Sequence, residues 1–130
     1  QFDWKLRNSK KVVLLERTNA RSLNENIISE RVDLIVCDVS FISLKKVILP
    51  SKRFLNDRFD LLVLLKPQFE TEKKNIGNGG IIKNPEIHKQ VCFDIENWIR
   101  KNFKFKIFKI FESPILGQKG NKEFFIYLKN

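Results

Sequence analysis

The chain has 130 residues, 42% of them hydrophobic and 12% aromatic, which is enough for a packed core in one domain or part of one. No apolar run approaches the roughly 18 residues that a membrane span requires, and no signal-peptide pattern occurs, so we expect a soluble, cytoplasmic protein. The 25 Lys and Arg outnumber the 15 Asp and Glu, and the formal net charge of +10 attracts polyanions such as nucleic acid. Biased codon usage explains a lysine-rich surface equally well.

The predicted elements alternate between helix and strand, which is typical of an α/β layered fold. Residues 2–8 fit the end of a helix, residues 12–15 a short buried strand and residues 23–29 a short helix. The nearly continuous apolar runs at 32–37 and 61–65 indicate parallel strands that are covered on both faces. Between these two strands, Ser43 can cap a helical turn that ends near Pro50.

The clearest helix is predicted from Pro85 to Lys101, with Asn84 as its N-cap. Alternating apolar and lysine residues at 103–107 predict an outer strand with one wet face. Residues 124–128 form the last predicted strand, which we expect to pair with it. The helix carries an apolar stripe at spacings of three and four that suits packing against a sheet, formed by Ile87, Val91, Ile95, Trp98 and Ile99.

One charged residue stands at the end of each of three apolar runs. Asp38 follows the first predicted parallel strand, Lys66 follows the second, and Glu123 precedes the last strand. Ligands bind beside the carboxyl ends of the strands in an open parallel sheet, so residues directly after such strands line the binding crevice. If the last strand is antiparallel, its start lies at the same edge, and we expect the three side chains to converge. Any one of them alone is more often a loop residue or a helix cap.

The stretches around these residues resemble the methyltransferase domain of the TlyA family. Members of that family are also called hemolysin A, but they act as ribosomal RNA 2′-O-methyltransferases related to the FtsJ-type enzymes. The resemblance covers essentially the whole chain. It rests on residues 4–7, 15–19, 36–43, 65–70, 77–80, 113–117 and 120–125.

The resemblance implies a Rossmann-like class I methyltransferase fold with three αβα layers, of which residues 1–130 would be the C-terminal part. The first two strands, their glycine-rich turn and an N-terminal S4-type RNA-binding domain have no counterpart here. The chain has no methionine, so we interpret Gln1 as a cut or trimmed end. A piece of this kind exposes sheet edges, and we expect it to self-associate and to be inactive alone.

The family uses S-adenosylmethionine as its methyl donor. The resemblance places Glu16, Arg17, Thr18 and Asn19 near the adenine of the donor, and Asp38, Val39 and Ser40 near its methionine end. A polar loop between a strand and a helix is the alternative interpretation of residues 16–19. The main donor-binding motif of the family is missing from this chain.

The resemblance also implies catalytic roles, because Asp38, Lys66 and Glu123 match three members of the family's Lys-Asp-Lys-Glu tetrad. Lys66 can act as a neutral amine that takes the proton of the ribose hydroxyl, or as an ammonium that stabilises the developing alkoxide. Burial favours the neutral form and the two carboxylates favour the charged form, so the sequence leaves both roles open.

The expected partner is ribosomal RNA or a ribosomal subunit, with no membrane partner. Phosphate contacts would come from lysines that flank the cleft, namely Lys73, Lys74, Lys83 and Lys119. The glycine-containing loop at 77–80 is either a mobile connector or a loop that contacts substrate. A non-catalytic basic module that binds RNA or ribosomes is the main alternative function. A membrane-active hemolysin is a remote alternative, because it needs a basic amphipathic helix with an exposed apolar face.

The cysteine and histidine content predicts no metal site. Cys37 and Cys92 lie far apart in the sequence, and His88 is the single histidine. We expect both cysteines to be reduced residues that line the core, and His88 to lie on the surface of its helix.

Overall fold

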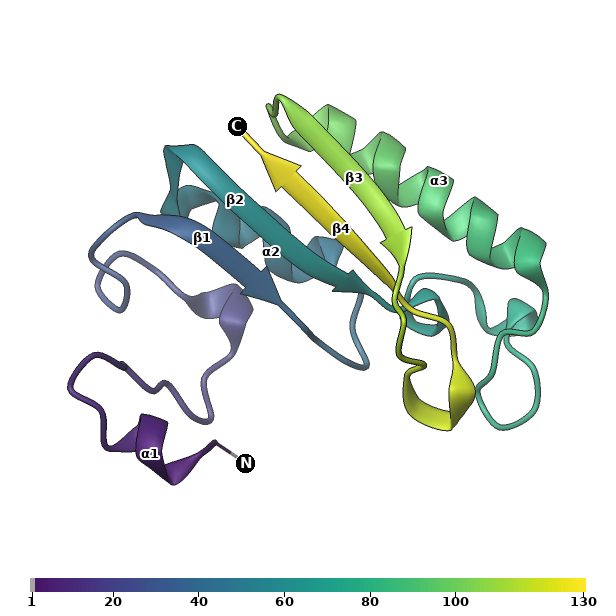
Figure 1. Cartoon of the computed structure of the whole chain (residues 1–130), viewed down its shortest axis with the longest axis horizontal. Coiled ribbons are helices and arrows are strands. Elements are labelled where there is room, and N and C mark those ends of the chain that lie inside the picture. The colour runs from purple at the N-terminus through teal and green to yellow at the C-terminus, as the bar shows by residue number, and fades with distance from the viewer. Residues whose placement is uncertain (1) are drawn as a thin grey trace.

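The computed structural model describes residues 2–130, and its centre is a four-stranded mixed sheet (Figure 1). Its strands lie in the order β1-β2-β4-β3, with β1 parallel to β2 and with β4 antiparallel to both of its neighbours. The start of β4 therefore lies beside the end of β2, as expected from the sequence. The strands are β1 (Val32–Cys37), β2 (Leu55–Leu65), β3 (Ile107–Glu112) and β4 (Phe124–Lys129).

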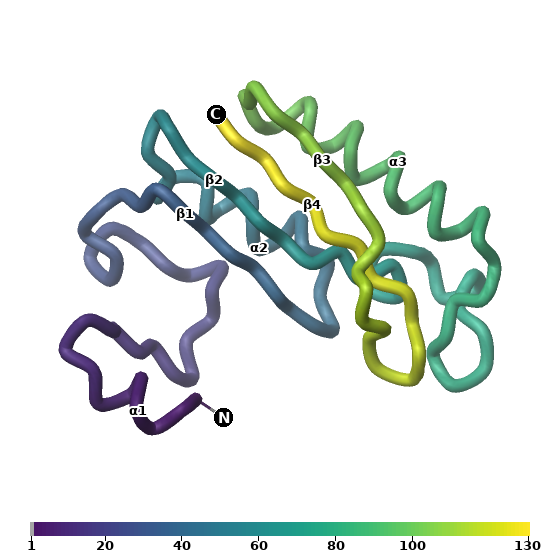
Figure 2. Tube along the Cα trace, viewed as in Figure 1, coloured from purple at the N-terminus to yellow at the C-terminus, as the bar shows by residue number. Residues whose placement is uncertain are grey.

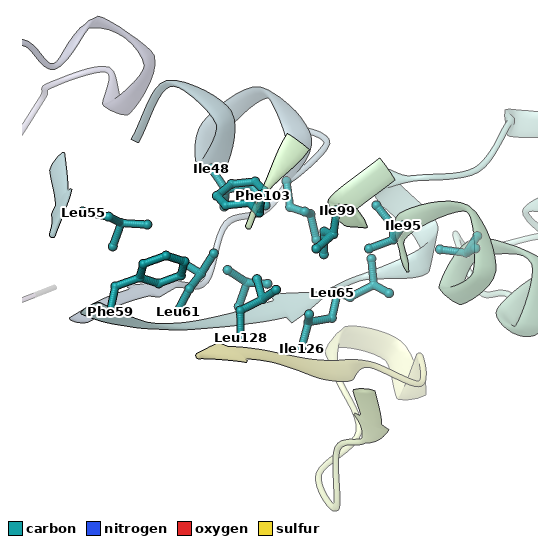
Figure 3. Packing of buried hydrophobic residues seen from close by; sticks show 13 residues of the cluster. Ile48, Leu55, Phe59, Leu61, Leu65, Ile95, Ile99, Phe103, Ile126 and Leu128 are labelled. Atoms are coloured by element: carbon teal, nitrogen blue, oxygen red, sulfur yellow. The ribbon is translucent and has the colours of Figure 1, made fainter. Parts of the chain in front are cut away.

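Two of the three α-helices pack on the same face of this sheet (Figures 1 and 3). These are α2 (Lys45–Ser51) and α3 (Pro85–Asn102), whereas α1 (Trp4–Arg7) lies in the N-terminal segment. Every helix within residues 2–130 is too short or too polar to span a bilayer. The connections also contain short 3₁₀ helices, which are η1 (Ala20–Ser22), η2 (Lys52–Phe54), η3 (Pro67–Phe69), η4 (Lys73–Asn75) and η5 (Gln118–Gly120).

The hydrophobic core lies between α3 and the inner strands of the sheet (Figure 3). Ile95 and Ile99 of α3 face Leu65 of β2 and Leu128 of β4, and each of these side chains is at most 1% exposed. Burying one such side chain stabilises the fold by about 1.5–3 kcal/mol. The core therefore fixes β2 and β4, the two strands whose neighbouring ends meet at the candidate site.

The other face of the sheet is not covered by a helix within residues 2–130. On β1, Leu34 is 56% exposed and Val36 is 67% exposed. Phe111 of β3 and Phe125 of β4 pack together on this face, with ring centroids 5.5 Å apart. The described chain thus has two layers, and the three-layer form implied by the resemblance stays a prediction, as do the missing strands.

The predicted strand at 12–15 and the predicted helix at 23–29 are wrong. Val13 is 83% exposed, and Figure 2 shows residues 2–31 as a largely irregular trace on the β1 side of the sheet. An isolated strand is unstable because its backbone groups need a partner strand, and β1 pairs only with β2 among the described residues. In the second segment, the Asn24 carbonyl accepts hydrogen bonds from Ile27 and Ile28, which closes a single turn that does not propagate.

The helix α3 and the last strand β4 confirm the sequence predictions. The Asn84 side chain accepts a hydrogen bond from the backbone N–H of Glu86 and caps the helix, as predicted. The strand predicted at 61–65 is longer than expected because it begins at Leu55. The outer strand begins only at Ile107, since Phe103 ends α3 as its C-cap and is buried.

His88 lies in the interior and not on the helix surface, so that prediction is wrong. It is 7% exposed, and its ring packs against Phe124 with centroids 6.0 Å apart. It shares the buried side of α3 with Val91 and Ile95, at a spacing that turns all three toward the sheet. Cys37 and Cys92 are free thiols that pack partly buried against the core, as expected.

Candidate active site

The ends of β1 and β2 bring Asp38 and Lys66 into direct contact. Lys66 Nζ forms a salt bridge with Asp38 Oδ1 at 2.6 Å and donates a hydrogen bond to Ser40 Oγ at 3.1 Å. The Lys66 side chain is 13% exposed, whereas that of Asp38 is 68% exposed. An ammonium has three N–H donors, so one remains for an oxygen atom of a substrate. The ammonium of Lys66 is thus largely buried, whereas the carboxylate of Asp38 is accessible from solvent.

Glu123 lies at the same edge of the sheet because of the pairing between β2 and β4. Leu65 is opposite Phe124, so Lys66 and Glu123 occupy the next positions on adjacent strands. Glu123 is 8% exposed, and its side chain lies against Gly117. Among residues 2–130, no ion pair joins Glu123 to a basic side chain. The fold thus gathers the three predicted residues at one edge and leaves the Glu123 carboxylate without a fixed cation.

A second carboxylate, that of the partly buried Glu70, ties together the loops that carry Asp38 and Lys66. The Ser43 hydroxyl donates to Glu70 Oε2 at 2.7 Å, and the Leu44 backbone N–H donates to Oε1 at 2.6 Å. Burial raises the pKa of the Glu70 carboxyl, although both hydrogen bonds act in the opposite direction. Glu70 therefore fixes the start of α2 to the loop after β2.

Phe41 lies in the sequence between Ser40, which contacts Lys66, and Ser43, which contacts Glu70, and it projects into solvent. It is 82% exposed, and its φ of 62° lies in the left-handed region that side-chain-bearing residues rarely adopt. Its ring packs against Phe69, with centroids 5.1 Å apart. Strained backbone of this kind persists where the surroundings hold it, and it is concentrated at ligand-binding sites. Phe41 is thus an exposed aromatic side chain in the loop that follows Asp38.

The hollow beside Phe41 is small and partly polar. Its volume is about 110 Å³, and Gln68, Gly79 and Lys119 contribute to its lining. Gln68 Oε1 is buried and has no hydrogen-bond partner among residues 2–130. The Lys119 ammonium donates to the Gly79 carbonyl at 2.8 Å and closes one side.

Asn121 holds the two glycine-containing loops side by side. It is 3% exposed, and its Oδ1 accepts a hydrogen bond from the Ile82 backbone at 3.0 Å. Its Nδ2 donates to the carbonyls of Gly80 at 2.9 Å and Gln118 at 3.3 Å. The loop at 77–80 is therefore anchored to the loop that leads into Glu123.

A larger apolar cleft of about 420 Å³ lies beside the end of β1. Asp38 and Val39 lie at one part of its lining, while Ala20 and Leu23 of the N-terminal segment close another part. Pockets for small organic ligands have volumes of roughly 300–1,000 Å³ and mostly apolar walls, and the cleft lies within this range.

The structure does not place residues 16–19 in that cleft. Glu16 instead forms a paired salt bridge with Arg7, with nitrogen–oxygen distances of 2.7 and 2.8 Å, and this contact lowers the pKa of Glu16. Asn19 caps η1, and the Thr18 hydroxyl donates to the carbonyl of Glu16. Arg17 has a φ of 53°. Ala20, directly after this segment, is the first residue of the chain that lines the cleft.

The predicted RNA-contacting lysines lie in the loops at the same edge of the sheet. Lys73 and Lys74 belong to η4, and Lys74 pairs with Glu72 at 2.7 Å. Lys83 is exposed just before α3, and Lys119 belongs to η5. These four lysines therefore lie at the carboxyl edge, while other basic residues, such as Arg100 and Lys101 at the end of α3, lie elsewhere.

Comparison with known proteins gives this geometry a context. Residues 1–130 match the model of the FtsJ-like methyltransferase family. The chain belongs to the FtsJ-like methyltransferase family. Asp38 and Lys66 are in contact and Glu123 lies at the neighbouring strand end in a chain of that family, while their catalytic roles stay a prediction.

Individual relatives are similar over almost the whole chain. The 16S/23S rRNA (cytidine-2′-O)-methyltransferase TlyA of Mycobacterium tuberculosis is 37% identical over 99% of this chain and 48% of its own length. The candidate rRNA methyltransferase YqxC of Bacillus subtilis is 34% identical over 98% of this chain and 46% of its own length. The solved structure of a candidate hemolysin from Streptococcus thermophilus superposes with a TM-score of 0.89 at 32% identity, covering all of this chain and 47% of that one. The chain thus spans about half the length of the curated relatives that it matches.

Three candidate residues were not assigned roles from the sequence. Glu70 ends the stretch 65–70, but its partners are 26 and 27 positions away and no spacing rule connects them. No feature of the sequence indicates that Phe41 is exposed or that its φ is positive. Asn121 lies between Gly120 and the charged residues Lys122 and Glu123. This position indicates a turn but does not indicate which loop the asparagine binds.

Proposed function

We propose that this chain is the part of an rRNA 2′-O-methyltransferase that carries the catalytic lysine, Lys66. The observation that carries the proposal is the 2.6 Å contact between Lys66 and Asp38 at the carboxyl edge of a sheet in a chain of this family. The substrate in this proposal is a ribose hydroxyl of ribosomal RNA. S-adenosylmethionine supplies an electrophilic methyl group when bound. We place the reaction in the cytoplasm, where ribosomes work.

Lys66 acts on the ribose hydroxyl in this proposal. In the neutral amine the third hydrogen position is a lone pair, which would face the 2′-hydroxyl and take its proton. The oxygen would gain the methyl group as the bond from methyl to the sulfonium sulfur breaks, with the demethylated thioether as the leaving group. Asp38 and Glu123 stabilise the ammonium that results, because negative charge nearby favours the protonated lysine. Holding the hydroxyl in line with the donor supplies much of the remaining rate enhancement.

The same residues determine how the donor and the RNA would bind. The apolar cleft beside Asp38 and Val39 takes part of S-adenosylmethionine, and Ser40 helps to orient its methionine end. Residues 16–19 reach the donor only if the salt bridge between Arg7 and Glu16 opens. The main donor-binding turn of the family has to come from outside this chain, so we propose that residues 1–130 alone do not transfer methyl groups.

Phe41 gives the RNA a place for its target base. A nucleobase stacked on the exposed ring would bring its own ribose toward the Asp38–Lys66 pair. Stacking on an aromatic side chain is worth about 1–3 kcal/mol per base and tolerates different bases. The surrounding lysines at 73, 74, 83 and 119 would hold the phosphates on either side.

The test combines donor binding with methyl transfer. A form of the protein that covers the full length of the relatives is titrated with S-adenosylmethionine and assayed with ribosomal RNA, beside the 130-residue chain. Lys66→Met should keep donor binding and lower kcat by about 10²–10⁴-fold, whereas Lys101→Met, at the far end of α3, should change neither. A Lys66→Met protein with the wild-type rate would overturn the proposal.

The dependence on pH separates the two roles of Lys66. A lysine that acts as a base gives a kcat that rises with pH as the ammonium is deprotonated. A lysine that must stay charged gives a kcat that falls at high pH. The second outcome would replace the base by electrostatic stabilisation and leave the assignment of the residue unchanged.

A non-catalytic RNA-binding module is the second candidate, favoured by the net charge of +10 and by the lysines around the carboxyl edge. It would become the better explanation if neither form of the protein bound S-adenosylmethionine. Membrane lysis has no such support, since α3 packs its apolar stripe against the sheet.

We also propose that the isolated chain self-associates through β1. Among residues 2–130 this strand is at the edge of the sheet and pairs with β2 only, and it presents exposed Leu34 and Val36. Such an edge pairs readily with another strand. Sedimentation velocity should show dimers or larger species that Val36→Lys reduces, and a monomer at every concentration would contradict the proposal.

A further inference from the structure

In the loop between β3 and β4, the Glu123 side chain occupies the space that a side chain at position 117 would need. A β-carbon placed on Gly117 would lie 2.0 Å from Oε1, 2.4 Å from Cδ and 3.0 Å from Cγ of Glu123. Non-bonded carbon atoms are normally about 3.5–4.0 Å apart, so an alanine here excludes the present position of the Glu123 side chain. The carboxylate therefore lies in a niche that exists because residue 117 has no side chain.

The backbone around this niche is fixed on both sides. The N–H of Gly117 donates to the carbonyl of Asn121 at 2.8 Å, and the N–H of Gly120 donates to the carbonyl of Gly117 at 3.0 Å. The N–H of Ser113 donates to the carbonyl of Glu123 at 2.8 Å. The two residues therefore cannot move apart without breaking the turn that leads into β4.

Conformational freedom is not the reason for a glycine at this position. Gly117 has a φ of −75°, which any residue adopts, whereas Gly120 in the same turn has a φ of +84°. An alanine at 117 thus keeps a permitted backbone and changes only the space beside Glu123. This separates a steric role from the usual role of glycine in turns.

We propose that Gly117 is a positioning residue for Glu123, and that its missing side chain holds the carboxylate at the edge beside Lys66. The inference rests on the proposed function of Glu123. The clashing atoms are the far end of a flexible side chain, so Gly117→Ala turns the carboxylate away from its present position. Misplacing a group at a reaction centre by about 1 Å can lower the rate about 10²-fold.

The experiment is a double-mutant cycle in a protein of the relatives' full length. Gly117→Ala and Glu123→Ala should lower kcat to a similar extent, about 10²-fold, with unchanged affinity for S-adenosylmethionine, and the double variant should lose no more than either alone. Leu116→Ala is the matched control, since this neighbour is 56% exposed, and it should keep the wild-type kcat. A folded Gly117→Ala protein with wild-type kcat would overturn the inference, and so would additive losses.

A stability measurement keeps the niche testable if Gly117→Ala folds poorly. Removing the Glu123 side chain removes the clash, so the Tm of Gly117→Ala should rise when Glu123→Ala is added. A Tm that does not rise contradicts the steric explanation. If the wild-type protein transfers no methyl group, the proposed function is overturned instead. The same Tm comparison then tests by itself whether Gly117 leaves the space for the Glu123 side chain.

Discussion

Glu70 and Ser43 join the two loops that leave the carboxyl ends of β2 and β1, through a hydrogen bond of 2.7 Å from the Ser43 hydroxyl to the carboxylate. The same carboxylate accepts from the Leu44 backbone. Glu70→Ala should therefore leave two donors without an acceptor and cost about 1–3 kcal/mol of unfolding free energy. It should also lower kcat, because the Asp38 loop loses its tie to the Lys66 loop. Thermal unfolding and methyl-transfer rates measure the two effects.

Glu70→Gln separates positioning from charge. The amide oxygen can accept from Leu44 while the amide nitrogen donates to Ser43, so this variant should recover most of both the Tm and kcat. Glu72→Ala is the matched control, since its side chain is 72% exposed and pairs only with Lys74. Equal losses for the Gln and Ala variants would mean that the carboxylate's charge matters, not the tie between the loops.

Phe41→Ala should raise the KM for RNA by about 5-fold to 150-fold, the range that corresponds to one stacked base. Its affinity for S-adenosylmethionine should stay unchanged, because Phe41 does not line the apolar cleft proposed for the donor. Phe41→Trp should keep a low KM. Phe93→Ala serves as the control, since Phe93 is a 61% exposed phenylalanine on α3. A Phe41→Ala protein that binds and methylates RNA normally would remove the stacking role.

Lys83→Ala should weaken RNA binding at all sequences alike, because a lysine contacts phosphates and not bases. The slope of log affinity against log salt concentration should fall by about one for each lost phosphate contact. Lys101→Ala provides the comparison, since it removes the same charge from the opposite end of α3. Identical salt slopes for the two variants would show that Lys83 acts only through net charge.

His88 makes stability dependent on pH. Burial lowers the pKa of His88, and the positive charge of Lys122 adds to this effect, while Glu112 opposes it. The folded state therefore prefers neutral His88, and stability is fully present above the ordinary histidine pKa of about 6.5. It is lost as the pH falls from there through the lower folded pKa, because the unfolded chain binds the proton more readily.

The measurement for this effect is Tm against pH for the wild type and for His88→Phe, between about pH 7.5 and about pH 5.5. The wild type should lose more stability over this range, since phenylalanine can pack against Phe124 without binding a proton. Other groups titrate equally in both proteins, so the difference between the curves isolates His88. Parallel curves would contradict the prediction.

The parts of the fold that could be predicted from the sequence follow from local rules. The apolar runs identify β1 and the core of β2, and the alignment of parallel strand ends brings Asp38 next to Lys66. The spacing that predicts the buried stripe of α3 also includes His88, since His88, Val91, Ile95 and Ile99 are three, four and four residues apart. The polarity of histidine predicts a surface position, whereas the spacing predicts a buried one, and the structure agrees with the spacing.

The remaining features depend on contacts between distant segments. The run at 12–15 has strand-like composition but no partner strand among the described residues, so its composition alone does not make it a strand. Glu70 acts through residues more than 25 positions away. The niche of Glu123 depends on the absence of atoms at Gly117, and a sequence pattern shows a glycine without showing which neighbour occupies its space.

The position of β4 has a consequence for how the protein is made. The last strand of the chain inserts between β2 and β3, so both of its ladders form only after residues 124–129 have been synthesised and have left the ribosome. Glu123 reaches the edge beside Lys66 in the same step. A prematurely ended chain would therefore lack the centre of its sheet as well as one carboxylate, and it would be open to proteolysis before it could carry a partial site.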